Sequence, residues 1–372
     1  MFLESTISDI ENYPFLNPFR FENDPSKKYW HISTLESLLE ENWNNIEEGV
    51  TENREYLAAR EKIFSSSVFQ YFTDQKNRII QESLETDNSF QILGAYTCLL
   101  DSIVQTAFDY SFIDIPLIKE RLLEELNHEL NYKQKNLPEK KEKLTLLKEQ
   151  ILEMEKNLES GSSSSREYRY FQEVESQHES ETRILEERIE ELQQLIPQIQ
   201  KFTNDKNFVL NHLVIFARGG YGRAELGLSS DRDLGYCLDT NRLNNGEAEM
   251  LRQLIVHIEN LLRNSGVETA HQYFEIDEDL SRFDEVNTLH TIPSILESRV
   301  LLGSESLATN LKNRFFQVIT FEPYVLNLVR SFSESKEPEL NRMDLKMDYG
   351  GLRSLQIPLW ITAATFGIFP SQ

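Results

Sequence analysis

The stretch that decides the fold is VIFARGGYGRAELGLSSDRDLGYCLD, residues 214–239. A short apolar run leads into Gly219-Gly220, and a second apolar run follows Asp231 and Asp233. Side chains of a β-strand alternate between its faces, so within a strand the two aspartates project from the same face. Neighbouring carboxylates repel each other unless cations lie between them and a substrate phosphate. Because glycine lets a backbone approach a phosphate closely, the stretch predicts a metal and phosphate site.

The composition of the chain limits its partners. Its 372 residues carry 38 Lys and Arg against 62 Asp and Glu, a formal net charge of −24. So acidic a chain lacks the basic surface that nucleic acid or an anionic membrane requires, and we expect neither as a partner. The N-terminus has no signal-peptide pattern, and no apolar run reaches the roughly 18–20 residues that span a bilayer. We therefore expect a soluble protein of the cytoplasm.

The two cysteines, Cys98 and Cys237, lie far apart in the sequence and show no CxxC spacing. This usage argues against a disulfide framework and against a zinc site. The only metal chemistry that the sequence suggests is therefore that of carboxylates.

Four parts with different patterns follow one another along the chain. They are an N-terminal helical region, a helical hairpin, a core of strands and helices, and a C-terminal helical domain, over residues 1–116, 117–202, 203–290 and 291–372. Apolar residues of the first part recur at helical spacing and predict helices from Ser33 and over 52–85 and 88–110. The chain stops at Gln372 within an expected helix, so we expect a truncated or divergent C-terminus. The predicted class is α+β.

The second part carries two heptad seams on either side of a serine tract, residues 160–165. Apolar residues alternate steps of three and four along both seams. The seams are Leu144, Leu147, Ile151, Met154 and Leu158, then Leu185, Ile189, Leu192, Ile196 and Ile199. This pattern predicts an antiparallel coiled-coil hairpin, through which the chain could form a homodimer. We expect Pro138 to open the first arm and Pro197 to end or kink the second.

The third part mixes strand and helix patterns. Strands are expected at 210–217, 232–239 and 269–276, with a helix near 246–264, and helices resume at 292–317 and 320–333. Two-metal phosphoryl or nucleotidyl transfer takes a third carboxylate from a neighbouring strand. In the third strand, alternation places Glu275 and Asp277 on one face together with His271 and Tyr273. Glu275 is our first choice as third ligand and Asp277 our second.

The transfer reaction also needs donors that hold the phosphates while a hydroxyl attacks in line. The backbone of Gly219-Gly220 suits this role, and Arg223 is a candidate side-chain donor. Asp231 and Asp233 suit the role of metal ligands. Either Glu275 or a metal-bound hydroxyl would assist deprotonation of the attacking group.

Three ordered motifs carry a family resemblance. Residues 219–226, GGYGRAEL, followed by SDRDL at 230–234, resemble the signature of protein-PII uridylyltransferases, within the DNA-polymerase-β nucleotidyltransferase superfamily. ILESRVLLG at 295–303 resembles the family's helix after the third strand. DLK with GGLRSLQ, within 344–356, resembles its LK…GGLRDIQ element. The resemblance covers about residues 205–365.

The resemblance implies a nucleotidyltransferase fold, with a small mixed sheet flanked by helices and a helical domain that closes over the nucleotide. It implies Mg²⁺ or Mn²⁺ and a nucleoside triphosphate, UTP or ATP, whose nucleoside monophosphate passes to a hydroxyl of a protein or small molecule. Carried over by position, Asp231 and Asp233 bind metal. Gly219, Gly220 and Ser230 lie at the phosphates, and Lys346 and Arg353 reach the nucleotide.

Several positions depart from the family's pattern. Arg232 stands where an apolar residue separates the aspartates, Gly235 follows where a large apolar residue is usual, and Ser354 replaces the aspartate of GLRD. AHQYF at 270–274 lacks the arginine of the family's GHSVR segment. These departures motivate a second hypothesis, a nucleotide-binding regulator that has lost turnover. A third makes the hairpin the functional part of an interaction scaffold. No HD-type or ACT-like pattern follows, so we do not expect a bifunctional PII-modifying enzyme.

Overall fold

The structure is a computed structural model that describes residues 53–85, 89–159, 165–224, 226–228, 230–276 and 294–318, with residues 35, 38, 39, 41, 42, 326, 330 and 358. The chain divides into two compact units. The first comprises Met1–Ile113, Asp205–Leu243 and Leu254–Gln372, and the second Asp114–Asn204 and Asn244–Gln253. The four-part division that the sequence suggested stays a prediction.

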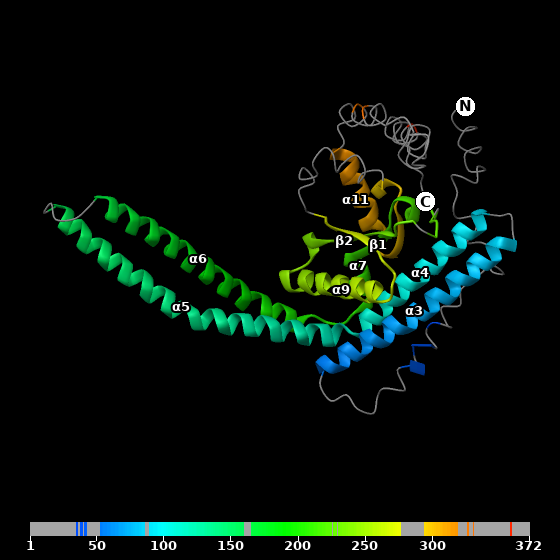
Figure 1. Ribbon diagram of the computed structural model, residues 1–372, viewed down its shortest axis with the longest axis horizontal. Coiled ribbons are helices and arrows are strands. Elements are labelled where there is room, and N and C mark those ends of the chain that lie inside the picture. Colours follow the sequence, from blue (N-terminus) through cyan, green and yellow to red (C-terminus); the bar gives the residue numbers. More distant parts are fainter. Residues whose placement is uncertain are drawn as a thin grey trace, which may run out of the picture. The chain divides into compact units, whose positions relative to one another are not determined.

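The second unit is built on a long helical hairpin. Helices α5 (Ile115–Glu159) and α6 (Ser165–Lys201) lie side by side along their length (Figure 1). Ile151 of α5 and Leu192 of α6, both predicted seam residues, are buried. Cross-arm contacts such as Lys140 with Glu181 at 2.6 Å show that the arms run antiparallel. Coiled-coil supercoiling and a dimer through the hairpin stay predictions.

Both prolines of the hairpin lie inside helices. The prediction that Pro138 opens the first arm is wrong, because α5 begins at Ile115. Pro197 does not end the second arm either, since α6 continues to Lys201. A proline costs a helix interior about 3 kcal/mol through its lost hydrogen bond and its ring clash. Buried residues on both sides of Pro197, Ile196 and Ile199, continue to pack and offset that cost.

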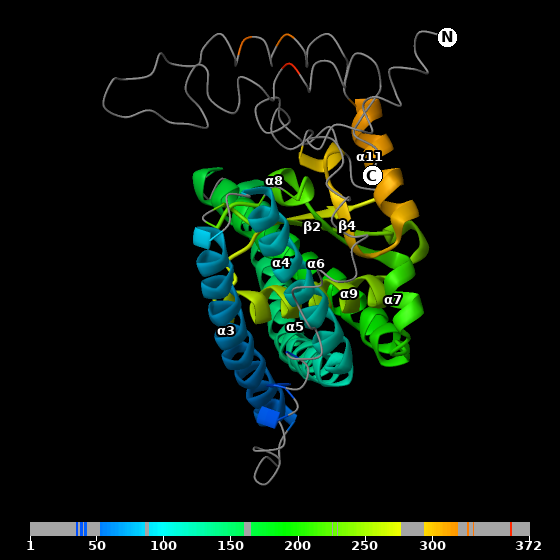
Figure 2. The same ribbon diagram turned by 90° about the vertical axis from the view of Figure 1, so that its right-hand side faces the viewer.

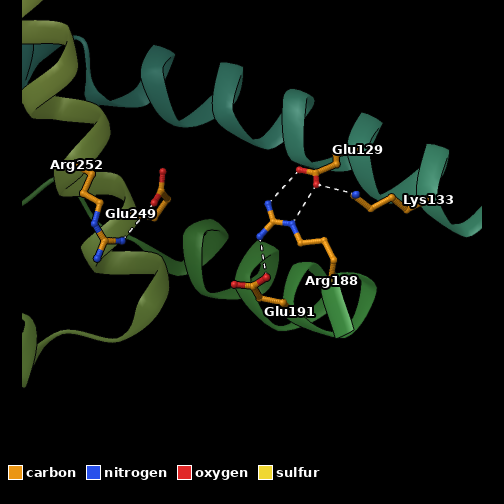
Figure 3. Close-up of polar contacts among 6 residues, drawn as sticks. All are labelled: Glu129, Lys133, Arg188, Glu191, Glu249 and Arg252. Atoms are coloured by element: carbon orange, nitrogen blue, oxygen red, sulfur yellow. Dashed lines mark hydrogen bonds and ion pairs between the residues drawn. The ribbon is translucent and has the colours of Figure 1, made fainter. Parts of the chain in front are cut away.

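A bidentate ion pair fixes the register of the two arms near their base. Arg188 donates from Nε to Glu129 Oε1 at 3.0 Å and from Nη2 to Glu129 Oε2 at 3.1 Å (Figure 3). Its Nη1 donates to Glu191 at 2.8 Å, and Lys133 lies 3.6 Å from Glu129. The forked geometry accepts one relative orientation of the partners. The hydrogen bonds from Arg188 are also the main reason that the pKa of Glu129 lies below its usual value.

Acid is expected to loosen the hairpin through Glu129. A carboxyl group with a lowered folded pKa contributes stability that is complete above its unfolded pKa, about 4.3, and is lost as the pH falls through the folded value. Both side chains of the pair stay 34% exposed, so the contribution is at most about 1 kcal/mol. Hydrogen-exchange protection of α5 and α6 in the full chain, corrected for intrinsic rates, should be lower in Glu129→Gln than in wild type at pH 7, and the difference should be smaller at pH 3.

The matched control is Glu139→Gln, because Glu139 pairs with Lys143 within α5 and not across the arms. It should leave the protection of α6 unchanged at either pH. A deficit of Glu129→Gln that persists undiminished at pH 3 would contradict the assignment.

The first unit is organised by a four-stranded mixed sheet of order β3-β2-β1-β4. The strands are β1 (Leu213–Ala217), β2 (Asp233–Leu238), β3 (Ala270–Glu275) and β4 (Arg299–Gly303). Strand β1 is antiparallel to β2 and to β4, whereas β2 and β3 are parallel. All five residues of β1 are buried, which places the centre of the core there. The α+β class is confirmed.

Helices surround this sheet. They are α3 (Asn53–Glu85), α4 (Ser89–Ile113), α7 (Lys206–His212), the single turn α8 (Gly219–Gly222), a 3₁₀ turn (Thr240–Arg242), α9 (Asn245–Asn264) and α11 (Glu305–Val318). The predicted helices over 52–85, 88–110 and 246–264 are confirmed. None of the helices in the described part of the chain is long and apolar enough to cross a membrane.

Strand alternation divides the helices between the two faces of the sheet. On one face, the Tyr236 hydroxyl donates to the buried carboxylate of Glu259 in α9, and burial is the main reason that the pKa of Tyr236 is raised. On the other face, Phe274 of β3 meets Phe315 of α11 edge to face, with 5.6 Å between ring centroids. Helix α11 thus lies across the sheet from α9 (Figure 2).

Two predictions of secondary structure are wrong. Residues 206–212 form helix α7, so the first strand begins at Leu213 and not at 210. Within the helix expected over 292–317, Arg299–Gly303 is strand β4, and α11 starts at Glu305. The apolar run Val300–Leu302 is too short for its period to separate helix from strand, and pairing with β1 decides the outcome. The expected helix over 320–333 lies outside the described residues, apart from Leu326 and Arg330.

Candidate active site

Gly219 and the second aspartate meet where β1 ends and β2 begins. After β1 the main-chain N–H of Arg218 donates to the Asp233 carbonyl at 2.9 Å, and the chain then turns through α8. A Cβ added at Gly219 would lie 3.4 Å from Oδ2 of Asp233. Gly219 has φ +53°, a conformation that favours glycine. We call this place, formed by Arg218, Gly219 and Asp233, the β1–β2 corner.

Asp231 and Ser230 lie in the loop that enters β2. The Ser230 hydroxyl accepts from the Gly227 N–H at 3.2 Å, while the Ser230 N–H donates to the Gly227 carbonyl at 3.0 Å. This turn sets the path of the chain into Asp231, whose side chain is exposed. The roles of Ser230 at a phosphate and of Asp231 at a metal stay predictions.

Arg232 points away from the aspartates. Its Nε and Nη2 donate to the hydroxyl of Tyr96 in α4 at 3.3 and 3.0 Å, and its Nη1 donates to the Glu268 carbonyl at 3.0 Å. Its guanidinium carbon lies 5.4 Å from the ring centroid of Phe72 in α3. Because consecutive residues of an extended chain project to opposite sides, Arg232 lies against α3 and α4, whereas Asp233 projects from the other face of the sheet. The structure therefore gives the residue that departs from the family's pattern a packing role against α3 and α4.

Gly235 makes room for an aromatic ring. It pairs with Phe216 across β1 and β2, and a Cβ at Gly235 would lie 2.2 Å from Cε2 of that ring. The Phe216 ring also stacks on Phe274, with 6.1 Å between centroids. An aromatic ring on the neighbouring strand covers the exposed backbone of a strand glycine. The glycine thus fits the packing of the sheet.

Arg223 joins two of the predicted motifs. Its Nη1 forms an ion pair with Oε2 of Glu297, which lies just before β4. A Cβ at Gly222 would lie 2.6 Å from the Glu297 carbonyl oxygen, so α8 and this segment are packed backbone to backbone. The structure therefore gives Arg223 a packing role between the motifs, and its role as a phosphate donor stays a prediction.

A buried arginine ties the same region to α4. Arg299 is 9% exposed and donates through Nη1 and Nη2 to both carboxylate oxygens of Asp101, at 2.8 and 3.0 Å. Its guanidinium carbon lies 6.0 Å from the ring centroid of Tyr221, which is fully buried. Burial first, and then Asp101, raise the pKa of Tyr221. The sequence reasoning missed Asp101, although a carboxylate inside the apolar run of α4 is a signal for a buried partner.

Glu275 is not the third carboxylate of this corner. In the parallel pair, Ala270 lies opposite Asp233, whereas Glu275 lies opposite Leu238 at the far end of β2. Five residues of strand separate the two acids by about 16 Å. Alternation also places Glu275 on the opposite face of the sheet from Asp233. The sequence predicted strand β3, but it could not show that β3 runs parallel to β2.

On the face that Asp233 occupies, β3 presents Ala270, Gln272 and Phe274. Arg218 donates from Nη1 to Oε1 of Gln272 and from Nε to the Leu234 carbonyl at 3.1 Å. Arg218 is 8% exposed, and burial lowers its pKa, while the charge of Asp233 acts in the opposite direction. The sequence reasoning missed both Arg218 and Gln272.

The donor set at the corner fits a hard cation. Within the residues that the structure describes, no three His, Cys, Asp or Glu side chains gather as a metal site. The carboxylates of Asp233, and of Asp231 in the adjoining loop, are nonetheless of the kind that binds Mg²⁺, which is often held by one or two carboxylates together with water and substrate phosphates. Asp277, the second choice as third ligand, lies outside the described residues, as do Lys346 and Arg353.

Comparison with known proteins gives a partial similarity. No protein-family model matches the chain. The bifunctional uridylyltransferase/uridylyl-removing enzyme of Zymomonas mobilis is 30% identical over 165 residues, which are 42% of this chain and 17% of that protein. The Azospirillum brasilense enzyme is 31% identical over 160 residues, 40% of this chain and 16% of that protein. The Pseudomonas fluorescens enzyme is 30% identical over 168 residues, which are 42% of this chain and 17% of that protein.

These alignments span less than a fifth of each relative's length. They confirm the resemblance that the three motifs indicated. About 42% of this chain is a region similar to bifunctional uridylyltransferase/uridylyl-removing enzymes.

Proposed function

We propose that this chain is a nucleotidyltransferase, which transfers the nucleoside monophosphate of UTP or ATP to a hydroxyl group and releases pyrophosphate. The acceptor is a protein or a small molecule. The observation that carries the proposal is the meeting of Gly219 with Asp233 at the β1–β2 corner. Support comes from the similarity to uridylyltransferases and from a mixed sheet flanked by helices, as a nucleotidyltransferase fold requires.

In this proposal Asp231 and Asp233 hold Mg²⁺ or Mn²⁺, which supplies charge neutralisation at the reacting phosphate. The missing side chain of Gly219 leaves space beside Asp233 Oδ2, so a phosphate can approach the backbone there. Arg218 keeps a positive charge next to Asp233 at the same corner. Transfer needs the acceptor oxygen, the phosphorus and the leaving oxygen in line. In this proposal the aspartates with their metal, the Gly219 backbone and Arg218 hold the phosphates in that arrangement.

A nucleotide-binding regulator with little turnover is the second candidate. It is favoured by the absence of an acid among Ala270, Gln272 and Phe274, the described residues of β3 on the Asp233 face. Two carboxylates could bind a nucleotide with its metal, yet a missing third ligand would slow the chemical step. A cytoplasmic location stays a prediction for either candidate.

Label transfer separates the two candidates. The full chain is incubated with a lysate and with α-labelled or γ-labelled UTP or ATP, in Mg²⁺ or in EDTA. We expect an acceptor to gain label from the α-labelled nucleotide only, because pyrophosphate carries the γ-phosphate away, and we expect EDTA to abolish the transfer. An Asp231→Ala/Asp233→Ala double variant should transfer nothing.

The matched control is Asp109→Asn, whose carboxylate belongs to an exposed ion pair with Lys206. It should transfer label at the wild-type rate. A nucleotide that raises Tm without any transfer would overturn the transferase and support the regulator, because ligand binding stabilises the folded state by mass action.

A further inference from the structure

The side chain of Arg218 reaches across β2. Its main-chain N–H is bonded to Asp233, its Nε donates to the Leu234 carbonyl at 3.1 Å, and its Nη1 donates to Oε1 of Gln272 in β3. The residue therefore starts at the end of β1 and contacts both of the next two strands. With 8% of its surface exposed, its position is fixed by these partners and not by solvent.

A buried guanidinium needs a negative charge near it, since burial of an unpaired charge is costly. Two of its partners, the Leu234 carbonyl and the Gln272 amide, carry no net charge. Asp233 supplies the negative charge at the corner and stabilises the protonated form of Arg218. Asp233 thus already has a cationic neighbour before any metal ion or nucleotide arrives.

Gln272 is the polar side chain of β3 that lies beside Arg218. It lies opposite Gly235, on the face of the sheet that Asp233 occupies. A carboxylate there would be one of the ligands that bridge two cations. The chain presents a neutral amide instead, and the oxygen of that amide accepts from Arg218.

The ligands near the corner favour one divalent ion. Asp231 and Asp233 are the carboxylates available to an ion, whereas the side chain on β3 that a second ion would need is a neutral amide whose oxygen accepts from Arg218. We propose that Arg218 is a built-in cation that replaces one metal ion, so that the site binds a single divalent ion together with its nucleotide. This inference rests on the proposed nucleotidyltransferase function.

Counting bound Mn²⁺ tests the inference without relying on activity. The full chain is saturated with an α,β-methylene analogue of UTP or ATP, and free Mn²⁺ is followed by electron paramagnetic resonance as the ion is added. We expect one bound ion per chain in wild type. The Arg218→Met/Gln272→Glu double variant removes the internal cation and restores a carboxylate, so we expect two.

Gln272→Glu alone is the matched control. Its new carboxylate would meet the Arg218 guanidinium, so we expect a higher Tm and still one bound ion.

Two ions in this single variant or in wild type would overturn the role of Arg218 and leave the nucleotidyltransferase proposal standing. No bound ion in wild type would overturn both. A folded double variant, verified by circular dichroism, that still binds one ion would also overturn the inference. If the double variant does not fold, the counts for wild type and Gln272→Glu decide.

Discussion

Asp231→Asn is expected to lower the rate of label transfer about 100-fold or more while the fold stays intact. A metal ligand at the reacting phosphate is worth several kcal/mol of transition-state stabilisation, and each factor of ten corresponds to about 1.4 kcal/mol. The fold does not depend on this residue, because the Asp231 side chain is exposed and lies before β2 begins. Initial rates of transfer and Tm by circular dichroism measure the two effects separately.

Asp233→Asn provides the contrast. It should abolish transfer as well, but it should also lower stability by about 1–3 kcal/mol, because buried Arg218 loses its neighbouring negative charge. Asp109→Asn, at an exposed ion pair, should change the free energy of unfolding by at most about 1 kcal/mol and leave transfer unchanged. Wild-type transfer by Asp231→Asn would show that the two aspartates do not act as a metal-binding pair.

Gly303→Ala is expected to prevent the first unit from folding stably. Gly303 ends β4 opposite Val214, with φ +93°. An added Cβ would lie 1.9 Å from the Leu213 carbonyl oxygen and 3.0 Å from the Val214 Cα. Both atoms belong to the backbone of the buried strand β1, so they cannot turn aside as a side chain could. Strain and overpacking together should cost about 2–6 kcal/mol, a large share of a typical stability of about 5–15 kcal/mol.

The urea midpoint of the full chain, followed by fluorescence, measures this loss, and a low soluble yield would accompany it. The matched control is Gly227→Ala in the same unit. Its Cβ would meet Ser230 Oγ at 3.0 Å, the end of a side chain that can rotate. We expect only a small change for this variant. Equal midpoints for the two variants would show that β4 does not pair with β1 in this register.

Much of the fold could be predicted where the signal is local. The segments predicted in this way each carry their own periodic pattern of apolar residues. They are the seams of the hairpin, the helices around 52–110 and the second and third strands. Strand β4 could not be predicted, because RVLLG fits a helix or a strand and only its partner β1 decides. The start of the first arm was wrongly predicted at Pro138 for a similar reason, because packing along the hairpin keeps α5 helical on both sides of that proline.

The candidate site also has a part that the local sequence predicted and a part that it did not. The glycine pair and the aspartates, each beside a short apolar run, were enough to predict one metal and phosphate site. Which other residues lie beside them depended on how the strands pair. Glu275 was excluded by the parallel direction of β3, and Arg218 was brought to Gln272 across a whole strand. The physical reason is that side-chain alternation is set within a strand, whereas register and direction are set by the partner strand.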